Sequence, residues 1–105
     1  MNSTIKLFGK RIKEIRKHRG ITQEKLAEML ELDNQTISRI ETGSYFTSYE
    51  NLEKMARILN SKIKDFFDFE HLRDENELKS YLIDKIGTLN AKELQKITKF
   101  VQEFI

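Results

Sequence analysis

Two short amphipathic patterns stand next to each other between Thr22 and Gly43, in the segment TQEKLAEMLELDNQTISRIETG. Each residue of an α-helix advances by about 100°, so side chains three and four positions apart share a face. Apolar residues recur at that spacing in both patterns, namely Leu26, Met29 and Leu30 in the first and Ile37 and Ile40 in the second. The segment therefore predicts two short helices joined by a tight turn.

Residues that suit helix ends mark the start of both helices. Thr22 precedes the first helix and Asp33 precedes the second, and both favour the N-cap position because their side-chain oxygens accept a free backbone N–H. Ala27 falls where the helices would cross, and its small side chain allows a close approach. Leu32, just past the turn, is expected to close the apolar cluster.

The second helix, predicted over residues 34–42, has an outer face of unusual composition. The side opposite its two isoleucines carries amide, hydroxyl and guanidinium groups, from Gln35, Ser38, Arg39 and Thr42. An ordinary solvated surface is the alternative interpretation, although such surfaces are more often rich in lysine and glutamate. Glutamine and asparagine match the edge of adenine, and arginine matches that of guanine. The pattern therefore predicts a helix that enters the major groove of DNA.

The run from Ile12 to Leu59 resembles the helix-turn-helix domain of the phage Cro and repressor family, also called the xenobiotic-response-element type. The matching pieces are RIKEIRKHRGITQEKLAEML, TISRIETG and TSYENLEKMARILN. The resemblance covers about residues 5–69 and implies an all-α fold, with a five-helix lambda-repressor-like DNA-binding domain over residues 1–69. Glu31 departs from the family, which usually has glycine in this turn; a non-glycine residue in the left-handed region costs about 1 kcal/mol.

The predicted DNA contacts divide into base readers and phosphate contacts. We expect Asn34, Gln35, Ser38 and Arg39 to read base edges. The resemblance implies that Gln23, at the exposed start of the preceding helix, binds a phosphate. We expect further phosphate contacts from Thr42, Lys10, Lys13 and Lys17.

A first helix is predicted over residues 4–18, with Ser3 or Thr4 as its cap and Gly20 at its end. Its buried face would carry Ile5, Phe8, Ile12 and Ile15, and a basic stripe of Lys6, Lys10, Lys13 and Lys17 would lie on the far side. Residues 1–20 hold seven lysine or arginine residues against one acidic residue, which makes this end attractive to a polyanion. For Lys6 and Lys13, plain solubility is an equal alternative. The four glycines are expected at helix ends and turns.

Arg16 differs from its basic neighbours because it lies beside the apolar arc of the first helix. Glu41 has the corresponding place on the predicted recognition helix. The resemblance implies that these two residues form a largely buried ion pair. Such a pair fixes orientation more reliably than it adds stability, because desolvation offsets much of the attraction.

The loop after Gly43 departs from the family, which commonly places a basic residue here to hold a phosphate. This chain has Ser44 to Thr47, so phosphate contacts would come from hydroxyls and backbone amides. Tyr45 and Phe46 are expected to pack within the loop, with a subunit contact as the alternative. A fourth helix capped by Ser48 is predicted to bury Tyr49, Leu52, Met55, Ala56 and Leu59, and a short fifth helix, starting at Ser61 or Lys62, is predicted to bury Ile63, Phe66 and Phe67.

Residues 70–105 match no further family position and predict a C-terminal two-helix hairpin after the polar linker HLRDEN. Its first helix, over residues 75–85, carries Leu78, Tyr81, Leu82, Ile83 and Ile86. Asn90 and Glu93 form a predicted capping box for the last helix, whose apolar side holds Leu94, Ile97, Phe100, Val101, Phe104 and Ile105. We expect a homodimer interface at Leu94, Ile97, Val101 and Phe104; packing on the chain's own core or capture of another protein are the alternatives.

The composition argues against several other classes of protein. The 105 residues include no Cys, no Pro and no run of about 18 apolar residues, which favours a cytoplasmic chain without a membrane span. His18 and His71 are expected to be solvated, and no catalytic, metal or cofactor pattern is found. We expect a bacterial or phage transcriptional regulator, a repressor bound to a palindromic operator of double-stranded DNA as a homodimer. An antitoxin or other protein-binding regulator is the alternative.

Overall fold

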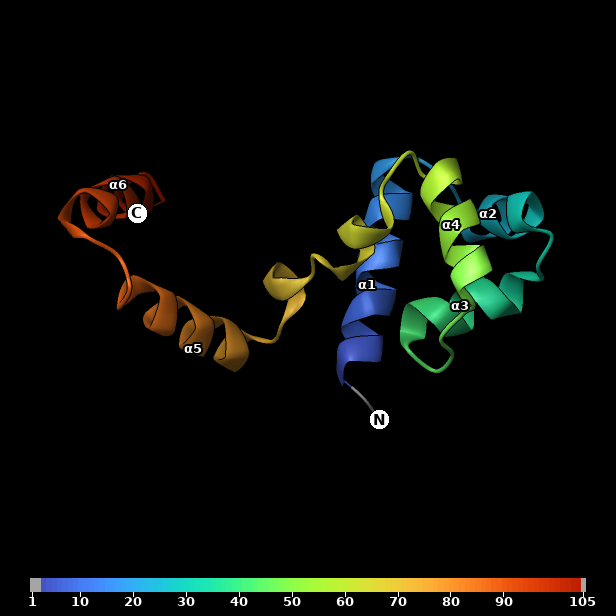
Figure 1. Ribbon diagram of the computed structural model, residues 1–105, viewed down its shortest axis with the longest axis horizontal. Helices are drawn as coiled ribbons and strands as arrows, with labels where there is room; N and C mark the ends of the chain where they lie inside the picture. The colour runs from blue at the N-terminus through green and yellow to red at the C-terminus, as the bar shows by residue number, and fades with distance from the viewer. Residues whose placement is uncertain (1–2, 105) are drawn as a thin grey trace. The chain divides into compact units, whose positions relative to one another are not determined.

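The computed structural model describes residues 3–104, which form helices and no strand (Figure 1). The chain divides into two compact units, residues 1–72 and 73–105. The first unit contains four α-helices and two 3-10 helices, namely α1 (Ser3–His18), α2 (Gln23–Leu30), α3 (Asn34–Thr42), α4 (Tyr49–Ile58), η1 (Ile63–Phe67) and η2 (Glu70–Leu72). The second contains α5 (Glu75–Ile86) and α6 (Ala91–Gln102). The predicted all-α fold is confirmed, with a 3-10 helix as the fifth helical element.

Three of the predicted N-caps are formed as the sequence indicates. The hydroxyl of Thr22 accepts the N–H of Lys25 at 3.0 Å, and the carboxylate of Asp33 accepts the N–H of Thr36 at 2.7 Å. Ser48 caps α4 in the same way. The prediction for α1 was wrong, because this helix already includes Ser3 and any cap falls outside the described residues.

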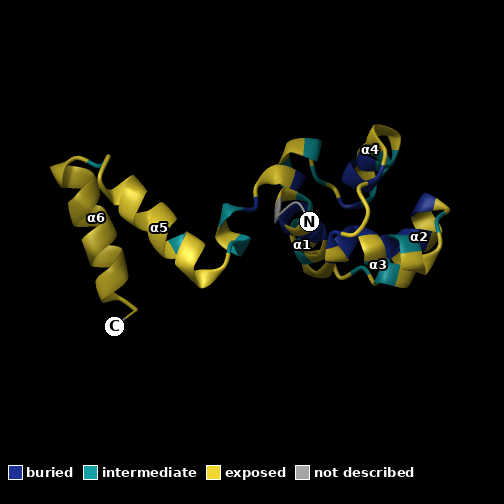
Figure 2. Cartoon of the chain, turned by 90° about the horizontal axis from the view of Figure 1, so that it is seen from below, coloured by how far each residue is buried: buried dark blue, intermediate teal, exposed yellow. Residues whose placement is uncertain are grey.

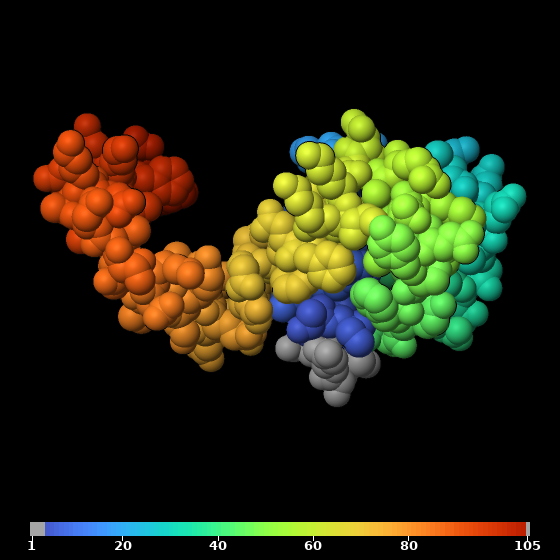
Figure 3. All heavy atoms as spheres, in the orientation of Figure 1, coloured from blue at the N-terminus to red at the C-terminus, as the bar shows by residue number. Residues whose placement is uncertain are grey.

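The core of the first unit joins α1, α2, α3, α4 and η1 (Figure 2), and Figure 3 shows the outer surface of the same unit. Its buried apolar residues are Leu7, Phe8, Ile12, Ile15, Leu26, Ala27, Leu30, Ile37, Ile40, Leu52, Met55, Ala56, Leu59, Phe66 and Phe69. Met29 and Tyr49 were wrongly predicted to be buried, since they are 47% and 67% exposed. Both lie in a terminal turn of a short helix. There the apolar face of the helix continues beyond the edge of the core, so a side chain on that face can still be exposed. Ile5 is only half-buried, and Leu7 takes part in the core instead.

Gly9 lies in the middle of α1, so the expectation that all four glycines occupy helix ends and turns was wrong. A Cβ atom at this position would stand 2.3 Å from the backbone oxygen of Ile40 and 2.7 Å from that of Glu41. The absence of a side chain therefore allows the backbones of α1 and α3 to touch.

The turn between α2 and α3 contains a left-handed residue although it lacks glycine. Glu31 adopts the left-handed conformation, with φ of 58°, and its N–H donates to the carbonyl of Glu28 at 3.1 Å. The N–H of Leu32 donates to the carbonyl of Ala27 at 2.9 Å. The chain thus accepts a strain of about 1 kcal/mol at Glu31, and two backbone hydrogen bonds close the turn.

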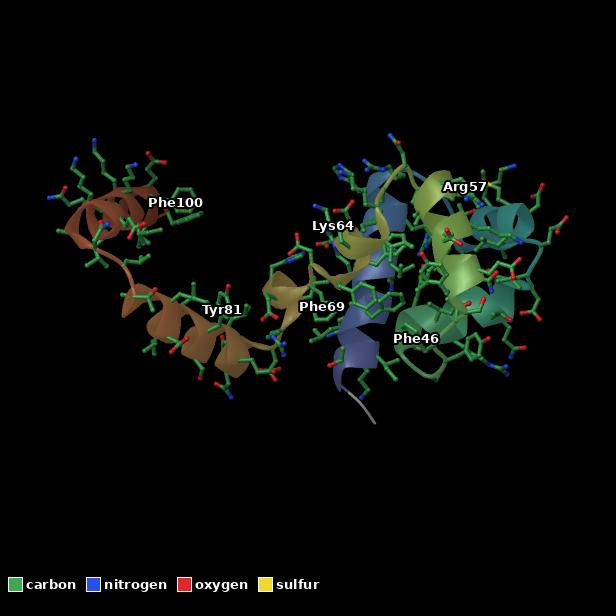
Figure 4. All side chains as sticks on the ribbon, in the orientation of Figure 1. Phe46, Arg57, Lys64, Phe69, Tyr81 and Phe100 are labelled. Carbon is green, nitrogen blue, oxygen red and sulfur yellow. The ribbon has the colours of Figure 1, made fainter. Side chains whose placement is uncertain are left out.

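An aromatic cluster closes the core beside η1. The ring of Phe8 lies 5.0 Å from that of Phe46 and 5.1 Å from that of Phe67, between ring centroids. Phe66 is fully buried, as predicted, but Phe67 was wrongly predicted to be buried and is 44% exposed, as is Phe46. Phe46, labelled in Figure 4, therefore packs on the core from the loop after α3, as predicted. Tyr45, which was expected to pack in the same loop, is instead 46% exposed.

The first unit continues past residue 69, where the sequence placed the domain boundary. Phe69 is buried and Leu72 packs against the core. His71, expected to be solvated, has its Nε2 atom 2.8 Å from Oε1 of Glu14 on α1. Partial burial acts to raise the pKa of Glu14, but hydrogen bonds from His71 and Arg11 outweigh it and lower that pKa. The first part of HLRDEN therefore belongs to the folded unit.

The second unit exposes the apolar residues of both its helices. Asn90 and Glu93 form the predicted capping box at the start of α6. None of the side chains described between residues 73 and 104 is buried, and Tyr81 and Phe100 project from their helices (Figure 4). The large apolar residues exposed on these helices include Leu82, Ile83, Ile86, Leu94, Ile97, Phe100, Val101 and Phe104. Ile105, which was predicted to lie on the apolar side of the last helix, falls outside the described residues. These two helices therefore carry an unsatisfied apolar surface.

We predict that Gly9→Ala destabilises the first unit. Alanine favours a helix interior over glycine by about 1 kcal/mol, but its Cβ would meet backbone atoms of α3 that cannot move aside alone. We expect a net loss of at least about 1 kcal/mol in the free energy of unfolding, measured with urea. Gly87→Ala is the control, because its Cβ would meet no atom closer than 3.4 Å. Equal stability of the two variants would contradict the close approach.

Candidate nucleic-acid interface

Helix α3 is anchored by two buried residues and presents a polar face to solvent. Ile37 and Ile40 are fully buried against α1 and α2. Asn34, Gln35, Arg39 and Thr42 are exposed, and Ser38 is half-buried. The structure therefore leaves the predicted base-reading face accessible.

The side chains on this face have few internal partners. Within the described part of the chain, no hydrogen bond or ion pair engages the side chains of Asn34, Gln35 and Arg39. Hydrogen bonds from Thr36 lower the pKa of Asp33, and the nearby charge of Arg39 adds to this effect. The hydroxyl of Thr42 lies 3.3 Å from the carbonyl oxygen of Arg39, to which it donates. The long polar groups are thus available to an external ligand.

A buried ion pair ties α3 to α1. Nε of Arg16 donates to Oε2 of Glu41 at 2.6 Å, and Nη2 donates to Oε1 at 3.0 Å. The two side chains are only 7% and 2% exposed. The remaining Nη1 donates to the backbone oxygen of Ile21 at 2.8 Å, so the guanidinium also holds the chain just before α2. The pair therefore holds together α1, α3 and the segment before α2.

Gln23 has a partner that the sequence did not reveal. Its Nε2 atom donates to Oε1 of Glu41 at 2.9 Å, and the residue is half-buried at the first position of α2. A carboxamide nitrogen carries two hydrogens, so one donor remains beyond this bond. Neither residue's position along the chain suggested the contact, because they are 18 residues apart and on different helices.

The predicted phosphate-binding lysines lie on one exposed strip of α1. Lys10, Lys13 and Lys17 follow Gly9 by one, four and eight positions. Helical geometry therefore places them within about 100° of the line on which α1 touches α3. The strip borders the contact with α3 and adds positive charge beside that helix.

The described residues contain no group of three His, Cys, Asp or Glu side chains that could hold a metal ion. None of the helices in the described part has the length and apolar character to cross a membrane.

A hollow lies between α1 and η1 and has charged walls. It is lined by Arg11, Glu14, Ile15, His18, Arg19, Ser61 and Asp65. Arg11 and Arg19 donate there to backbone carbonyls, so both guanidinium groups help to hold α1 to the segments beside it.

Comparison with known proteins identifies related chains and folds. The helix-turn-helix family model matches residues 12–66. An uncharacterised HTH-type transcriptional regulator of Archaeoglobus fulgidus is 43% identical over 68 residues, covering 65% of this chain and 90% of the relative. An immunity repressor protein of Bacillus phage phi105 is 33% identical over 95 residues, covering 90% and 60%. The restriction-modification controller protein C.AhdI from Aeromonas hydrophila aligns with a TM-score of 0.60 and 30% identity, covering 63% of this chain and all of that one.

We predict that Glu41→Ala unfolds or loosens the first unit. The substitution leaves the buried guanidinium of Arg16 without its counter-charge, at a cost of about 3–5 kcal/mol. Thermal and urea unfolding measure the loss. Glu53→Ala, at an exposed position of α4, is the matched control and should change stability by less than about 0.5 kcal/mol. An unchanged melting temperature for Glu41→Ala would refute the structural role of the pair.

Proposed function

The chain belongs to the helix-turn-helix family of DNA-binding transcriptional regulators, and we propose that it represses transcription by occupying a palindromic operator as a homodimer. The observation that carries the proposal is the exposed face of α3, whose amide and guanidinium groups have no partner within the described part of the chain. Polar side chains of this kind gain most from a ligand that presents matching donors and acceptors. The major-groove edges of base pairs do so.

Each exposed residue of α3 has a role under this proposal. Gln35 and Arg39 read base edges, since both can form paired hydrogen bonds with a single base. Asn34 and Ser38 lie on the same face and reach neighbouring bases. Thr42, at the far end of the helix, contacts the sugar–phosphate backbone.

Phosphate contacts supply affinity without sequence information. Gln23, Lys10, Lys13 and Lys17 are assigned to this role because they surround α3 on α1 and α2. The loop after α3 has hydroxyl and aromatic side chains at positions where a basic residue would strengthen binding to a DNA phosphate. We therefore expect one copy to hold DNA weakly and to depend on a second.

The exposed apolar surface of α5 and α6 supports self-association. A patch of this kind in water commonly marks an interface. Residues 73–105 contain six basic and six acidic residues, so two copies of this unit do not repel each other. Two copies related by a twofold axis would place their recognition helices in half-sites about 34 Å apart. Leu94, Ile97, Val101 and Phe104 are assigned to this interface.

Selection of bound DNA from a random pool tests the proposal as a whole. We expect a palindrome whose half-sites are centred about one helical turn apart. Enrichment of a non-repeated site would retain DNA recognition but exclude the symmetric dimer. Absence of any enriched sequence would refute sequence-specific binding.

We predict that Arg39→Ala and Lys10→Ala affect DNA binding in different ways. Loss of Arg39 should cost about 1–3 kcal/mol on the preferred site and relax selectivity at one base pair. Loss of Lys10 should weaken binding to all sequences alike and reduce the salt slope by roughly one unit. Titrations on specific and scrambled duplexes at several salt concentrations measure both effects. If Arg39→Ala weakens both duplexes equally, Arg39 is not a base reader.

We predict that Ile97→Glu converts the homodimer to a monomer and weakens operator binding. The carboxylate would be buried in the apolar interface of α6, where nothing compensates its charge. Sedimentation equilibrium measures the mass, and titration of the whole operator measures the affinity. Lys99→Glu changes the charge at an exposed position about 160° around the same helix from Ile97 and should leave the dimer intact. A wild-type chain that is monomeric by itself would favour a different protein as the occupant of this surface.

A further inference from the structure

The carboxylate of Glu41 serves two elements at once. Its Oε1 atom accepts one hydrogen bond from Arg16 and another from Gln23, at 3.0 and 2.9 Å. Arg16 lies on α1 and Gln23 on α2, whereas Glu41 itself belongs to α3. The buried ion pair therefore extends to a side chain that reaches the surface.

We propose that Glu41 is a positioning residue for DNA binding, which holds the carboxamide of Gln23 ready to donate to a phosphate. The inference rests on the proposed function, because it concerns the phosphate contact assigned to Gln23. Beyond that function, it assigns to the buried ion pair a direct effect on DNA affinity.

The chemistry of the two groups fixes the orientation of the amide. An ionised carboxylate only accepts hydrogen bonds, so the NH₂ group of Gln23 must face Glu41 and its oxygen cannot. The second hydrogen of the same nitrogen stays available to an external acceptor. A phosphate oxygen is such an acceptor, and it forms a charge-assisted bond with this donor.

The arrangement also removes an entropic cost from binding. A free glutamine side chain loses much of its rotamer freedom when it is ordered by a ligand. Gln23 is ordered before DNA arrives, because Glu41 is itself held by two bonds from Arg16. The negative charge of Glu41 does not oppose the phosphate, since its side chain is 2% exposed and neutralised by the guanidinium.

Gln35 provides an internal comparison. It is an exposed glutamine of α3, and no hydrogen bond within the described residues engages its side chain. The two glutamines therefore differ in pre-ordering although both are assigned to DNA contacts.

The first test replaces the ion pair by an apolar pair. Arg16→Met combined with Glu41→Met removes both buried charges together, and such replacements are often neutral or stabilising. The expected result is an unchanged or raised melting temperature together with about a threefold to tenfold loss of affinity for the selected operator. If the pair only stabilised the fold, a variant with an unchanged or raised melting temperature would keep its affinity for the operator.

A double-mutant cycle assigns that loss to Gln23. Gln23→Ala should weaken operator binding in the wild-type background and should have little further effect in the Arg16→Met/Glu41→Met background. Equal effects of Gln23→Ala in both backgrounds would overturn the positioning role and leave the proposed function intact. Failure of the wild-type chain to bind any DNA would overturn both.

The second test needs no variant and remains valid if the double substitution prevents folding. Nuclear magnetic relaxation of the side-chain amide nitrogens reports their motion in the free protein. We expect the amide of Gln23 to be about as rigid as the backbone and that of Gln35 to be mobile. Equal mobility of the two amides would overturn the inference.

Discussion

The contact between α1 and α3 is the constraint on which the DNA-binding unit depends. Gly9 allows the two backbones to meet, and the pair of Arg16 and Glu41 fixes their relative orientation. A helix as short as α3 is not stable alone in water, because the cost of nucleation outweighs so few hydrogen bonds. Its position is therefore set by what it packs against, and a small shift at this contact would move every side chain on the exposed face of α3.

The ion pair is better suited to specifying geometry than to adding stability. Removal of two charges from water costs several kcal/mol per ion, and their attraction in the interior repays this only when the geometry is good. Here both carboxylate oxygens of Glu41 and all three guanidinium nitrogens of Arg16 have partners. These hydrogen bonds therefore offset most of the desolvation cost. An apolar pair could fill the same space but could not hold Gln23. Under the proposed positioning role, the charge of Glu41 thus acts on a side chain at the surface as well as inside the core.

The amino-acid sequence predicts most of the fold but less of the site. Periodicity locates the helices, and Thr22, Asp33 and Ser48 mark their starts because N-capping is a local interaction. Met29 and Tyr49 were misplaced because periodicity does not reveal where the core ends. The role of Gly9 and the bond from Gln23 to Glu41 could not be predicted, since both depend on how separate helices cross.

The two units differ in how their apolar surface is satisfied. The first unit buries most of its large apolar residues in one core, whereas α5 and α6 leave theirs exposed. On the proposed operator, a second copy covers that surface and also brings a second recognition helix. Once one helix has bound its half-site, the other is held close to the second half-site, at a high effective concentration. Under the proposed function, the loop after α3, which has no basic residue, adds little to the affinity of a single copy for DNA. Occupancy of the operator would therefore rise steeply with protein concentration, because dimer formation and DNA binding stabilise each other.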